Sequence, residues 1–349
     1  MKRDEKAKIA VCFVVAVALI AGFWLALEQI EAHLGVGTVK AENAQLSWEE
    51  ESGQAQGTLK LAGDKYDYQH EFETYLIMGT DASGNEKTED KGYQGDMADF
   101  LLLAVFDRTD DTYGFIQLDR DTMTEVTLLL EDNTGMATAD LQLCTAHWYG
   151  GDEAAGCENT VQAVKKMLGG LPIDGYCSID MEDIPTLNRL VGGVEITLED
   201  DFTQSDKEMV KGATLTLTDE QAYLYIRGRY GVGDETNASR MKRQKQYMHA
   251  FFEKVKVRMQ EDRSFINDAY KQMEDVAVTD ISGKQVSRLT KLIMEGESKG
   301  IREFEGTYKL GQALGDGLDH NEFYIDKESK IQVMTEMYGL EKREPKKSK

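Results

Sequence analysis

The chain has 349 residues, of which 41% are hydrophobic and 30% are charged. That composition is typical of a globular protein and excludes an intrinsically disordered chain. The formal net charge of -23 argues against a protein that wraps a nucleic-acid backbone, because such binding needs a broad basic face. An anionic ligand must therefore bind at a local cluster of basic residues, and no nucleic acid is expected among the partners.

The N-terminus has the features of a membrane anchor. Residues 1–8 contain four basic side chains, and the apolar run that follows them has no charge over residues 9–27. About 20 apolar residues are enough to cross a bilayer as a helix, which predicts a transmembrane helix over residues 9–28. The basic flank predicts a cytoplasmic N-terminus at residues 1–8 and an extracellular remainder. A cleaved signal peptide and a buried soluble helix are the alternatives.

The rest of the chain divides by composition. Residues 29–68 are polar and weakly patterned, which is typical of a stalk, and residues 339–349 form a basic tail that we expect to be loose. Between them, residues 69–338 alternate strand-like and helix-like segments, which predicts one α/β domain with a central mixed β-sheet between two layers of helices. The clearest segments are strands at 75–79, 100–107 and 113–119, and helices at 158–170 and 240–259.

Three cysteines follow the predicted anchor. Cys144 and Cys157 are close enough in sequence to close a short loop in an oxidising compartment, which would leave Cys177 over. No cysteine or histidine spacing matches a zinc site, and no GxSxG motif is present. The sequence therefore favours neither a zinc enzyme nor a serine hydrolase.

Acidic residues cluster at the predicted strand ends. Asp81 follows the strand at 75–79, Asp99 precedes the strand at 100–107, and Arg120 and Asp121 end the third strand. If these strands run antiparallel in sequence order, all four side chains lie at one edge of the sheet. Two carboxylates beside an arginine suit a divalent cation that bridges to phosphate oxygens. The alternative is that the aspartates cap turns and Arg120 neutralises them.

Positive charge gathers in the segment "YIRGRYGVGDETNASRMKRQK", residues 225–245. Helical spacing from Ser239 onward places Arg240 and Arg243 in the first turns of a helix, where cations are unfavourable to the helix dipole. Two arginines at a helix N-terminus are a suitable site for phosphate, with a solvated surface as the alternative. If these arginines hold a phosphate, replacing Arg243 with glutamine should leave thermal stability unchanged or slightly raised, whereas a structural ion pair would make the same change destabilising. Arg227 and Arg229 would share one face if their segment is extended.

These motifs occur in an order that resembles the LytR-CpsA-Psr family. The resemblance rests on "GTD" (79–81), "LDRDT" (118–122), "AHWYGG" (146–151), "LPIDGYCSIDMEDIPTLNRLVGGVEI" (171–196) and "LTDEQAYLYIRGRYGVGD…SRMKRQKQ", behind a single anchor. Members of that family transfer teichoic acids, capsule and other wall glycopolymers from an undecaprenyl-pyrophosphate carrier to peptidoglycan. Many also hydrolyse polyprenyl pyrophosphates. Their fold is a sheet between helices, with a tunnel for the lipid tail.

The resemblance assigns roles to individual residues. Asp81 and Asp99 match the aspartates that hold magnesium, for which manganese can substitute, and Arg120 and Asp121 match the catalytic pair. The pyrophosphate contacts are implied for Arg120, Arg227, Arg229, Arg240, Arg243 and Gln244. The implied protein is an extracellular phosphotransferase on the cell membrane of a Gram-positive-type envelope.

Two positions depart from the family pattern. Ser83 and Met97 stand where the family usually has arginine, two residues after the first aspartate and two before the second. Losing cations from a site built on cations weakens the stabilisation of a charged transition state. The alternatives to a transferase are therefore a member that binds polyprenyl-linked polymer or cell wall without turnover, and a regulatory protein.

Overall fold

The computed structural model of the protein describes residues 58–81, 96–228, 231–262 and 295–344, with residue 265 and short pieces between 277 and 293. The predicted anchor, Ser83 and Arg229 lie outside the described residues. Within the described part, none of the helices combines the length and the apolar character needed to cross a membrane.

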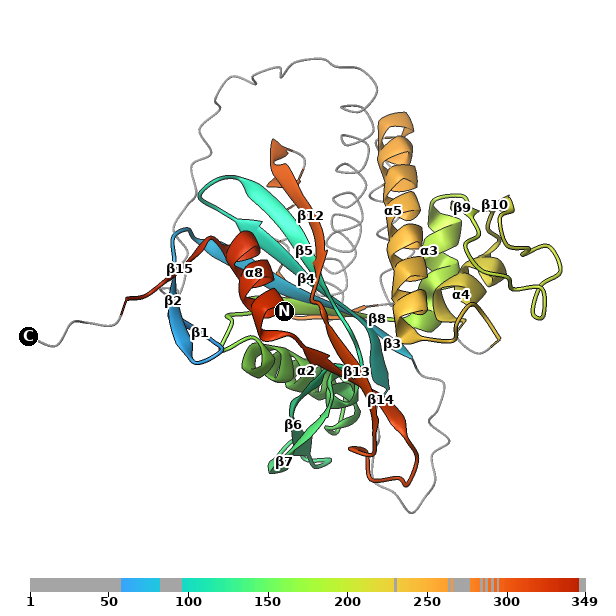
Figure 1. Ribbon diagram of the computed structural model, residues 1–349. Helices are drawn as coiled ribbons and strands as arrows, with labels where there is room; N and C mark the ends of the chain where they lie inside the picture. The colour runs from blue at the N-terminus through green and yellow to red at the C-terminus, as the bar shows by residue number, and fades with distance from the viewer. Residues whose placement is uncertain are drawn as a thin grey trace, which may run out of the picture.

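A mixed sheet of six strands forms the centre of the molecule (Figure 1). In spatial order its strands are β11 (Ala277–Thr279), β8 (Gly175–Asp180), β3 (Phe72–Asp81), β4 (Met97–Asp107), β5 (Thr112–Leu118) and β12 (Glu297–Glu303). The β3–β8 and β5–β12 pairs are parallel, and the other neighbours are antiparallel. The predicted α/β fold with a central mixed sheet is confirmed.

Helices cover both faces of this sheet. Tyr75 and Ile77 on β3 point into a core shared with α3 (Ile184–Leu190), α4 (Asp219–Arg227) and α5 (Asn237–Glu261). The alternate side chains Leu76 and Met78 point into a second core, which is shared with α2 (Glu153–Met167) and α8 (Lys327–Tyr338). Successive side chains of a strand point to opposite faces, so a run that is apolar at every position must be buried on both sides. In Figure 1, α3, α4 and α5 lie together on one side of the sheet, away from α2 and α8.

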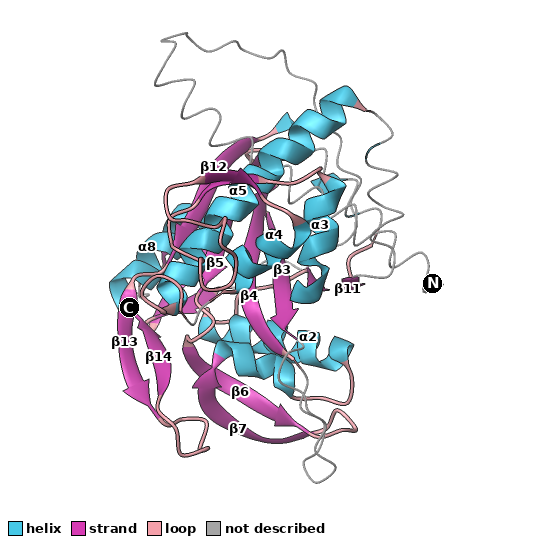
Figure 2. Ribbon diagram, turned by 90° about the vertical axis from the view of Figure 1, so that its right-hand side faces the viewer, coloured by secondary structure: helices cyan, strands magenta, loops and turns pink. Residues whose placement is uncertain are grey.

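Several short elements are attached to this framework. Two hairpins project from the same end of the molecule, as Figure 1 and Figure 2 both show. The hairpins are β6 (Met123–Leu129) with β7 (Gly135–Gln142), and β13 (Gly306–Gly311) with β14 (His320–Ile325). Other short elements are the 3-10 helices η1 (Leu143–Trp148) and η2 (Met181–Asp183), and the strand pair β9 (Glu195–Thr197) and β10 (Thr214–Thr216).

The folded part is longer than the sequence predicts. Strands β1 (Leu59–Leu61) and β2 (Asp64–Tyr68) lie within the expected stalk, and β15 (Leu340–Lys342) lies within the expected tail. These three strands form one small sheet with β2 in the middle, and its leucines at both ends of β1 are almost fully buried. Folded strands therefore extend past the predicted boundaries at 69 and 338, because β2 pairs both with β1 beside it in sequence and with β15 from the other end of the chain.

The three cysteines in the described part of the chain are free thiols. Cys144, Cys157 and Cys177 are buried, so the disulfide considered for the first two is not formed. Cys157 instead contacts Nε2 of His147 through its sulfur at 3.4 Å. Burial raises the pKa of Cys144 to about 11 and that of Cys177 to about 12, so both are uncharged at neutral pH.

Candidate phosphate site

The predicted meeting of strand ends is observed. Asp81 at the end of β3 is paired with Met97 at the start of β4, and Leu118 at the end of β5 is paired with Leu101 of β4. The residues that follow β5, Arg120 and Asp121, therefore lie at the same edge of the sheet as Asp81. An antiparallel order of three sequential strands is sufficient to produce this arrangement.

A β-bulge directs Asp99. Thr80 pairs with Ala98 and Gly79 pairs with Phe100, which leaves Asp99 as the extra residue on β4. Ala98, before the bulge, packs in the core shared with α2 and α8, whereas Phe100, after it, packs in the core shared with α3, α4 and α5. Residues two apart in a regular strand would face the same core, so the bulge at Asp99 shifts the alternation of side chains by one residue. Bulges commonly redirect a side chain beside a functional site. No feature of the sequence indicated this one.

Asp99 joins two arginines. Its Oδ1 lies 3.1 Å from Nη1 of Arg120, and its Oδ2 accepts from Nη1 of Arg240 at 2.8 Å. All three side chains are largely buried. Nε of Arg120 also lies 3.7 Å from Oδ1 of Asp121, and its Nη2 contacts the sulfur atoms of Met97 and Cys144. The guanidinium of Arg120 therefore contacts two carboxylates and two sulfur atoms, and one of the sulfur atoms belongs to Met97.

Asp81 is bound by Arg227. The guanidinium contacts both carboxylate oxygens, at 2.8 Å and 3.0 Å, in the two-point geometry that arginine favours. Arg227 is the last residue of α4, so the extended conformation considered for this segment is not formed at Arg227. Thr218 and Gln221 form a capping box that starts this helix, and Gly228 ends it. Arg227 also contacts the hydroxyl of Tyr223 one turn earlier.

Arg243 has a structural position. It is 1% exposed, and its guanidinium donates to Asp200 at 2.7 Å, to Ser239 at 3.0 Å and to the carbonyl oxygens of Tyr225 and Gly228. The structure therefore predicts that its replacement lowers stability, where the sequence predicted no loss. Charge and helical position gave no sign of the partly buried carboxylate that the loop after β9 supplies.

The two lysines of the basic segment lie on the surface and pair with acidic residues outside the site. Lys242 and Lys245 form surface ion pairs with Glu199 and Glu303. The helix that carries them starts at Asn237, capped by the hydroxyl of Thr236. Of the predicted phosphate ligands in this segment, Arg227 and Arg240 thus reach the aspartate edge.

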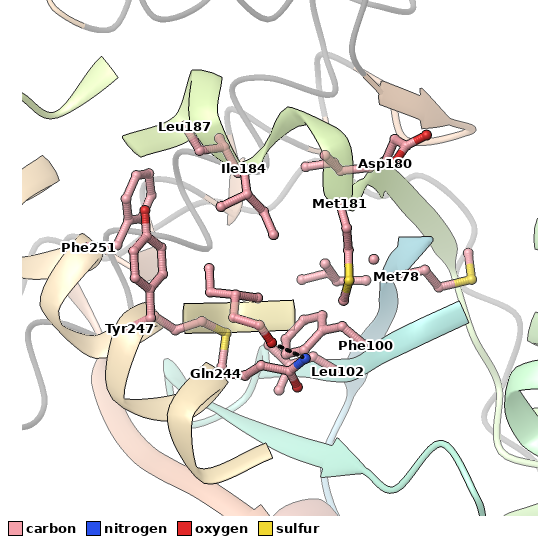
Figure 3. A pocket seen from close by; sticks show the side chains of 15 residues that line it. Met78, Phe100, Leu102, Asp180, Met181, Ile184, Leu187, Gln244, Tyr247 and Phe251 are labelled. Carbon is pink, nitrogen blue, oxygen red and sulfur yellow. Dashed lines mark hydrogen bonds between the residues drawn. The ribbon is translucent and has the colours of Figure 1, made fainter. Parts of the chain in front are cut away.

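An apolar cavity of about 140 Å³ adjoins the charged residues (Figure 3). Gln244, Tyr247 and Phe251 reach into it from α5 and meet Ile184 and Leu187 from α3. Its wall also includes the immediate sequence neighbours of the charged residues, namely Phe100 beside Asp99, Ile226 beside Arg227 and Gln244 beside Arg243. Gln244 is 2% exposed, and its Nε2 donates to the carbonyl oxygen of Ile226 at 3.5 Å.

The carboxylates of the predicted metal site, Asp81 and Asp99, form ion pairs with arginines. Both oxygens of Asp81 and both of Asp99 contact guanidinium groups. They remain the hard oxygen donors that magnesium prefers, and each oxygen has a second lone pair. Among the described residues, the compact set of potential metal ligands is instead His70, Asp107 and Asp110, at the opposite end of β4.

Sequence reasoning missed Asp119 and Asn237. Asp119 immediately precedes Arg120, and its buried carboxylate accepts from Nδ2 of Asn237 at 2.9 Å. Asn237 is the first residue of α5 and contacts Arg240 through its Oδ1. The only signal was the acidic residue within "LDRDT", which the strand pattern did not distinguish from a turn residue.

Two relatives illustrate the similarity at the level of sequence. Biofilm regulatory protein A of Streptococcus mutans is 30% identical over 188 residues, which are 52% of this chain and 43% of that protein. The polyisoprenyl-teichoic acid–peptidoglycan teichoic acid transferase TagU of Bacillus cereus is 27% identical over 179 residues, 51% of each chain. The chain thus matches about half the length of these relatives.

Solved structures share the fold. Protein gbs0355 of Streptococcus agalactiae has a TM-score of 0.58 at 21% identity over 76% of this chain and 88% of that one. TagT bound to LI-WTA has a TM-score of 0.54 at 19% identity over 76% and 90%. The LytR_cpsA_psr family model matches residues 37–338. With the strand-end site and the fold in agreement, the chain belongs to the LytR-CpsA-Psr family.

Proposed function

We propose that this protein is a membrane-anchored extracellular phosphotransferase that moves a glycopolymer from an undecaprenyl-pyrophosphate carrier onto peptidoglycan. The observation that carries the proposal is the apolar cavity whose wall is continuous in sequence with the arginine and aspartate cluster. A polyprenyl pyrophosphate has matching parts, an apolar tail and an anionic head. Membership of the family and the activity named for the TagU relative support the same substrate class.

The charge of the cluster suits an anion that arrives with a cation. Among the residues that the structure describes here, the four carboxylates of Asp81, Asp99, Asp119 and Asp121 outnumber the three guanidinium groups of Arg120, Arg227 and Arg240 by one. A pyrophosphate would add further negative charge, and the arginines alone would not balance it. A divalent cation would restore the balance.

Magnesium, or manganese in its place, is the ion we propose for Asp81 and Asp99. When bound it would neutralise charge on the phosphate oxygens. The arginines now on these aspartates, Arg227 and Arg240, would then turn to the pyrophosphate, because carboxylate and phosphate present equivalent oxygen acceptors to a guanidinium. Arg229 and Arg243 were assigned to the same ligand. Arg229 stays in the proposal, whereas Arg243 is placed as a support for the helix start.

The reaction is a substitution at phosphorus. A hydroxyl of peptidoglycan attacks the phosphorus that carries the polymer, the bond from that phosphorus to the bridging oxygen breaks, and the polyprenyl monophosphate leaves. Arg120 is placed to stabilise charge that develops on the phosphate oxygens. Asp121 lies beside Arg120 and orients it, and we assign to it the proton of the attacking hydroxyl. Water in place of the acceptor gives the pyrophosphatase side activity.

A second candidate function is binding without turnover. It is favoured by Met97, whose uncharged side chain contacts Arg120 where the family pattern has a cation. The regulatory alternative has a parallel in the name of the Streptococcus mutans relative. Anchoring at the cell membrane through residues 9–28 is part of the main proposal, and a C-terminal reporter that is active only in the cytoplasm should be silent.

The test uses the purified full chain with geranylgeranyl pyrophosphate as probe. We expect release of phosphate that requires magnesium or manganese, and loss of that metal dependence in Asp81→Ala and Asp99→Ala. Asp132→Ala, at the exposed turn of the β6–β7 hairpin, is the control and should behave as wild type. Binding of the probe without turnover would establish the second candidate. Failure of both binding and turnover would refute the proposed substrate class.

A further inference from the structure

Both carboxylate oxygens of Asp119 accept hydrogen bonds at the loop that carries Arg120, residues 119–122, which we call the arginine loop. Its Oδ1 accepts from the backbone N–H of Asp121 at 2.8 Å and from Nδ2 of Asn237 at 2.9 Å. Its Oδ2 accepts from the hydroxyl of Tyr308 on β13. The carboxylate is 7% exposed, so these bonds replace the water that it loses on folding. One side chain therefore connects the loop that presents Arg120, the start of α5 and the C-terminal hairpin.

Asn237 links Asp119 to Arg240 through hydrogen bonds at both ends of its amide. Its Oδ1 accepts from Nη2 of Arg240 at 2.7 Å and from Nε at 3.2 Å. A guanidinium can only donate and an ionised carboxylate can only accept, so Asp119 and Arg240 together fix which end of the amide faces each of them. Arg240 in turn donates to Asp99. A continuous chain of hydrogen bonds thus runs from Tyr308 to Asp99.

The β13–β14 hairpin holds the arginine loop at a second point. The backbone N–H of Phe323 donates to the carbonyl oxygen of Asp121 at 2.8 Å, and Thr122 forms a β-bridge with Phe323. The rings of Tyr308 and Phe323 lie 4.8 Å apart between centroids, so the two holding points support each other. The hairpin therefore contacts the residues on both sides of Arg120.

Burial and the neighbouring groups have opposite effects on the pKa of Asp119. It raises the pKa of the carboxyl, while hydrogen bonds from Tyr308, Asp121 and Asn237 and the charge of Arg120 lower it. The upward effect prevails, so Asp119 takes up a proton at a higher pH than an exposed aspartate does. A protonated Asp119 would carry its proton on one oxygen and so lose one acceptor position in this chain of hydrogen bonds.

We propose that Asp119 and Tyr308 are positioning residues, which orient Asn237 and thereby hold Arg240 where it meets the substrate pyrophosphate. The catalytic part of this inference rests on the proposed function. The structural part does not, because it concerns only how Arg240 is held. The C-terminal hairpin is then part of the working site and not a separate appendage.

The first measurement reports on Arg240 without any substrate. The exchange of its Nε proton with solvent is followed by NMR in the full chain, with the signal assigned from Arg240→Lys. Wild type should show a protected proton, and Asp119→Asn and Tyr308→Phe should each speed its exchange about 10-fold, the scale of one charge-assisted hydrogen bond. Tyr324→Phe is the matched control, since it removes a hydroxyl on the neighbouring strand that binds Glu322. Unchanged protection in Asp119→Asn would overturn the inference.

The second measurement is turnover of geranylgeranyl pyrophosphate. We expect kcat/KM to fall about 10-fold in each variant and no further in the double variant, because both substitutions break one chain. The acidic limb of the pH profile should move to lower pH in Asp119→Asn. Normal turnover in both variants would overturn the catalytic role. Absence of turnover in wild type, with the expected exchange pattern, would refute the proposed function and leave the positioning of Arg240 supported.

Discussion

Replacing Arg243 with methionine tests whether this buried arginine and its ion pair with Asp200 hold the start of α5. Methionine has a similar length, retains the apolar stem and removes the guanidinium. The substitution leaves the Asp200 carboxylate without its 2.7 Å partner and leaves the carbonyl oxygens of Tyr225 and Gly228 without a donor. These acceptors come from the loop after β9 and from the end of α4, so three segments lose a common contact.

The expected loss follows from the burial of Arg243, which is 1% exposed, beside an Asp200 side chain that is 16% exposed. Breaking a fully buried ion pair by removing one partner costs about 3–5 kcal/mol, and the lower end applies here because the Asp200 carboxylate keeps some contact with water. For a domain of about this size, 1 kcal/mol corresponds to roughly 2–4 °C in Tm, so a loss of about 3 kcal/mol should lower the melting temperature by about 6–12 °C. Replacing Asp200 with leucine as well should restore part of the loss, since the orphaned carboxylate is then absent.

Thermal unfolding of the full chain, followed by circular dichroism, measures this difference. Lys242→Met is the matched control, because it removes the same charge one position earlier on α5 from a surface pair with Glu199. That control should melt with wild type, since exposed ion pairs contribute little. Equal melting temperatures for Arg243→Met and Lys242→Met would refute the structural assignment of Arg243. They would also return Arg243 to the set of pyrophosphate ligands.

Three further predictions concern the two cores. Burial lowers the pKa of His147, so the free energy of unfolding should drop as the pH falls below about 6.5, the pKa of a histidine in the unfolded chain. Urea titrations at several pH values should show a weaker drop in His147→Gln, whereas His320→Gln on the exposed hairpin should follow wild type. Filling the apolar cavity with Ile184→Trp should weaken binding of geranylgeranyl pyrophosphate at least about 10-fold while inorganic pyrophosphate binds as before, which calorimetry can compare; equal losses for both ligands would place the tail elsewhere. Cys144 and Cys157 should react with a thiol reagent only after unfolding, because both are buried and protonated; rapid labelling of the native chain would contradict their placement.

The local sequence determined the framework of this protein. Uninterrupted apolar runs such as 100–106 must be covered on both faces, which requires a sheet between two layers of helices. The sequential order of three strands then places Asp81, Asp99 and Arg120 at one edge, as the structure confirms. Periodicity and strand ends are properties of neighbouring residues, so they can be read from the chain alone.

Only the tertiary structure decided which arginine meets which acid. Arg240 and Arg243 are three residues apart on one helix, yet one reaches Asp99 and the other is enclosed by Asp200. The sequence assigns them the same role because charge and helical position are alike. Their partners lie 141 and 43 residues away along the chain, and such pairings depend on how α5 packs against the sheet and the loop after β9. The same reason hid Asp119, whose two side-chain partners, Asn237 and Tyr308, come from 118 and 189 residues further along the chain.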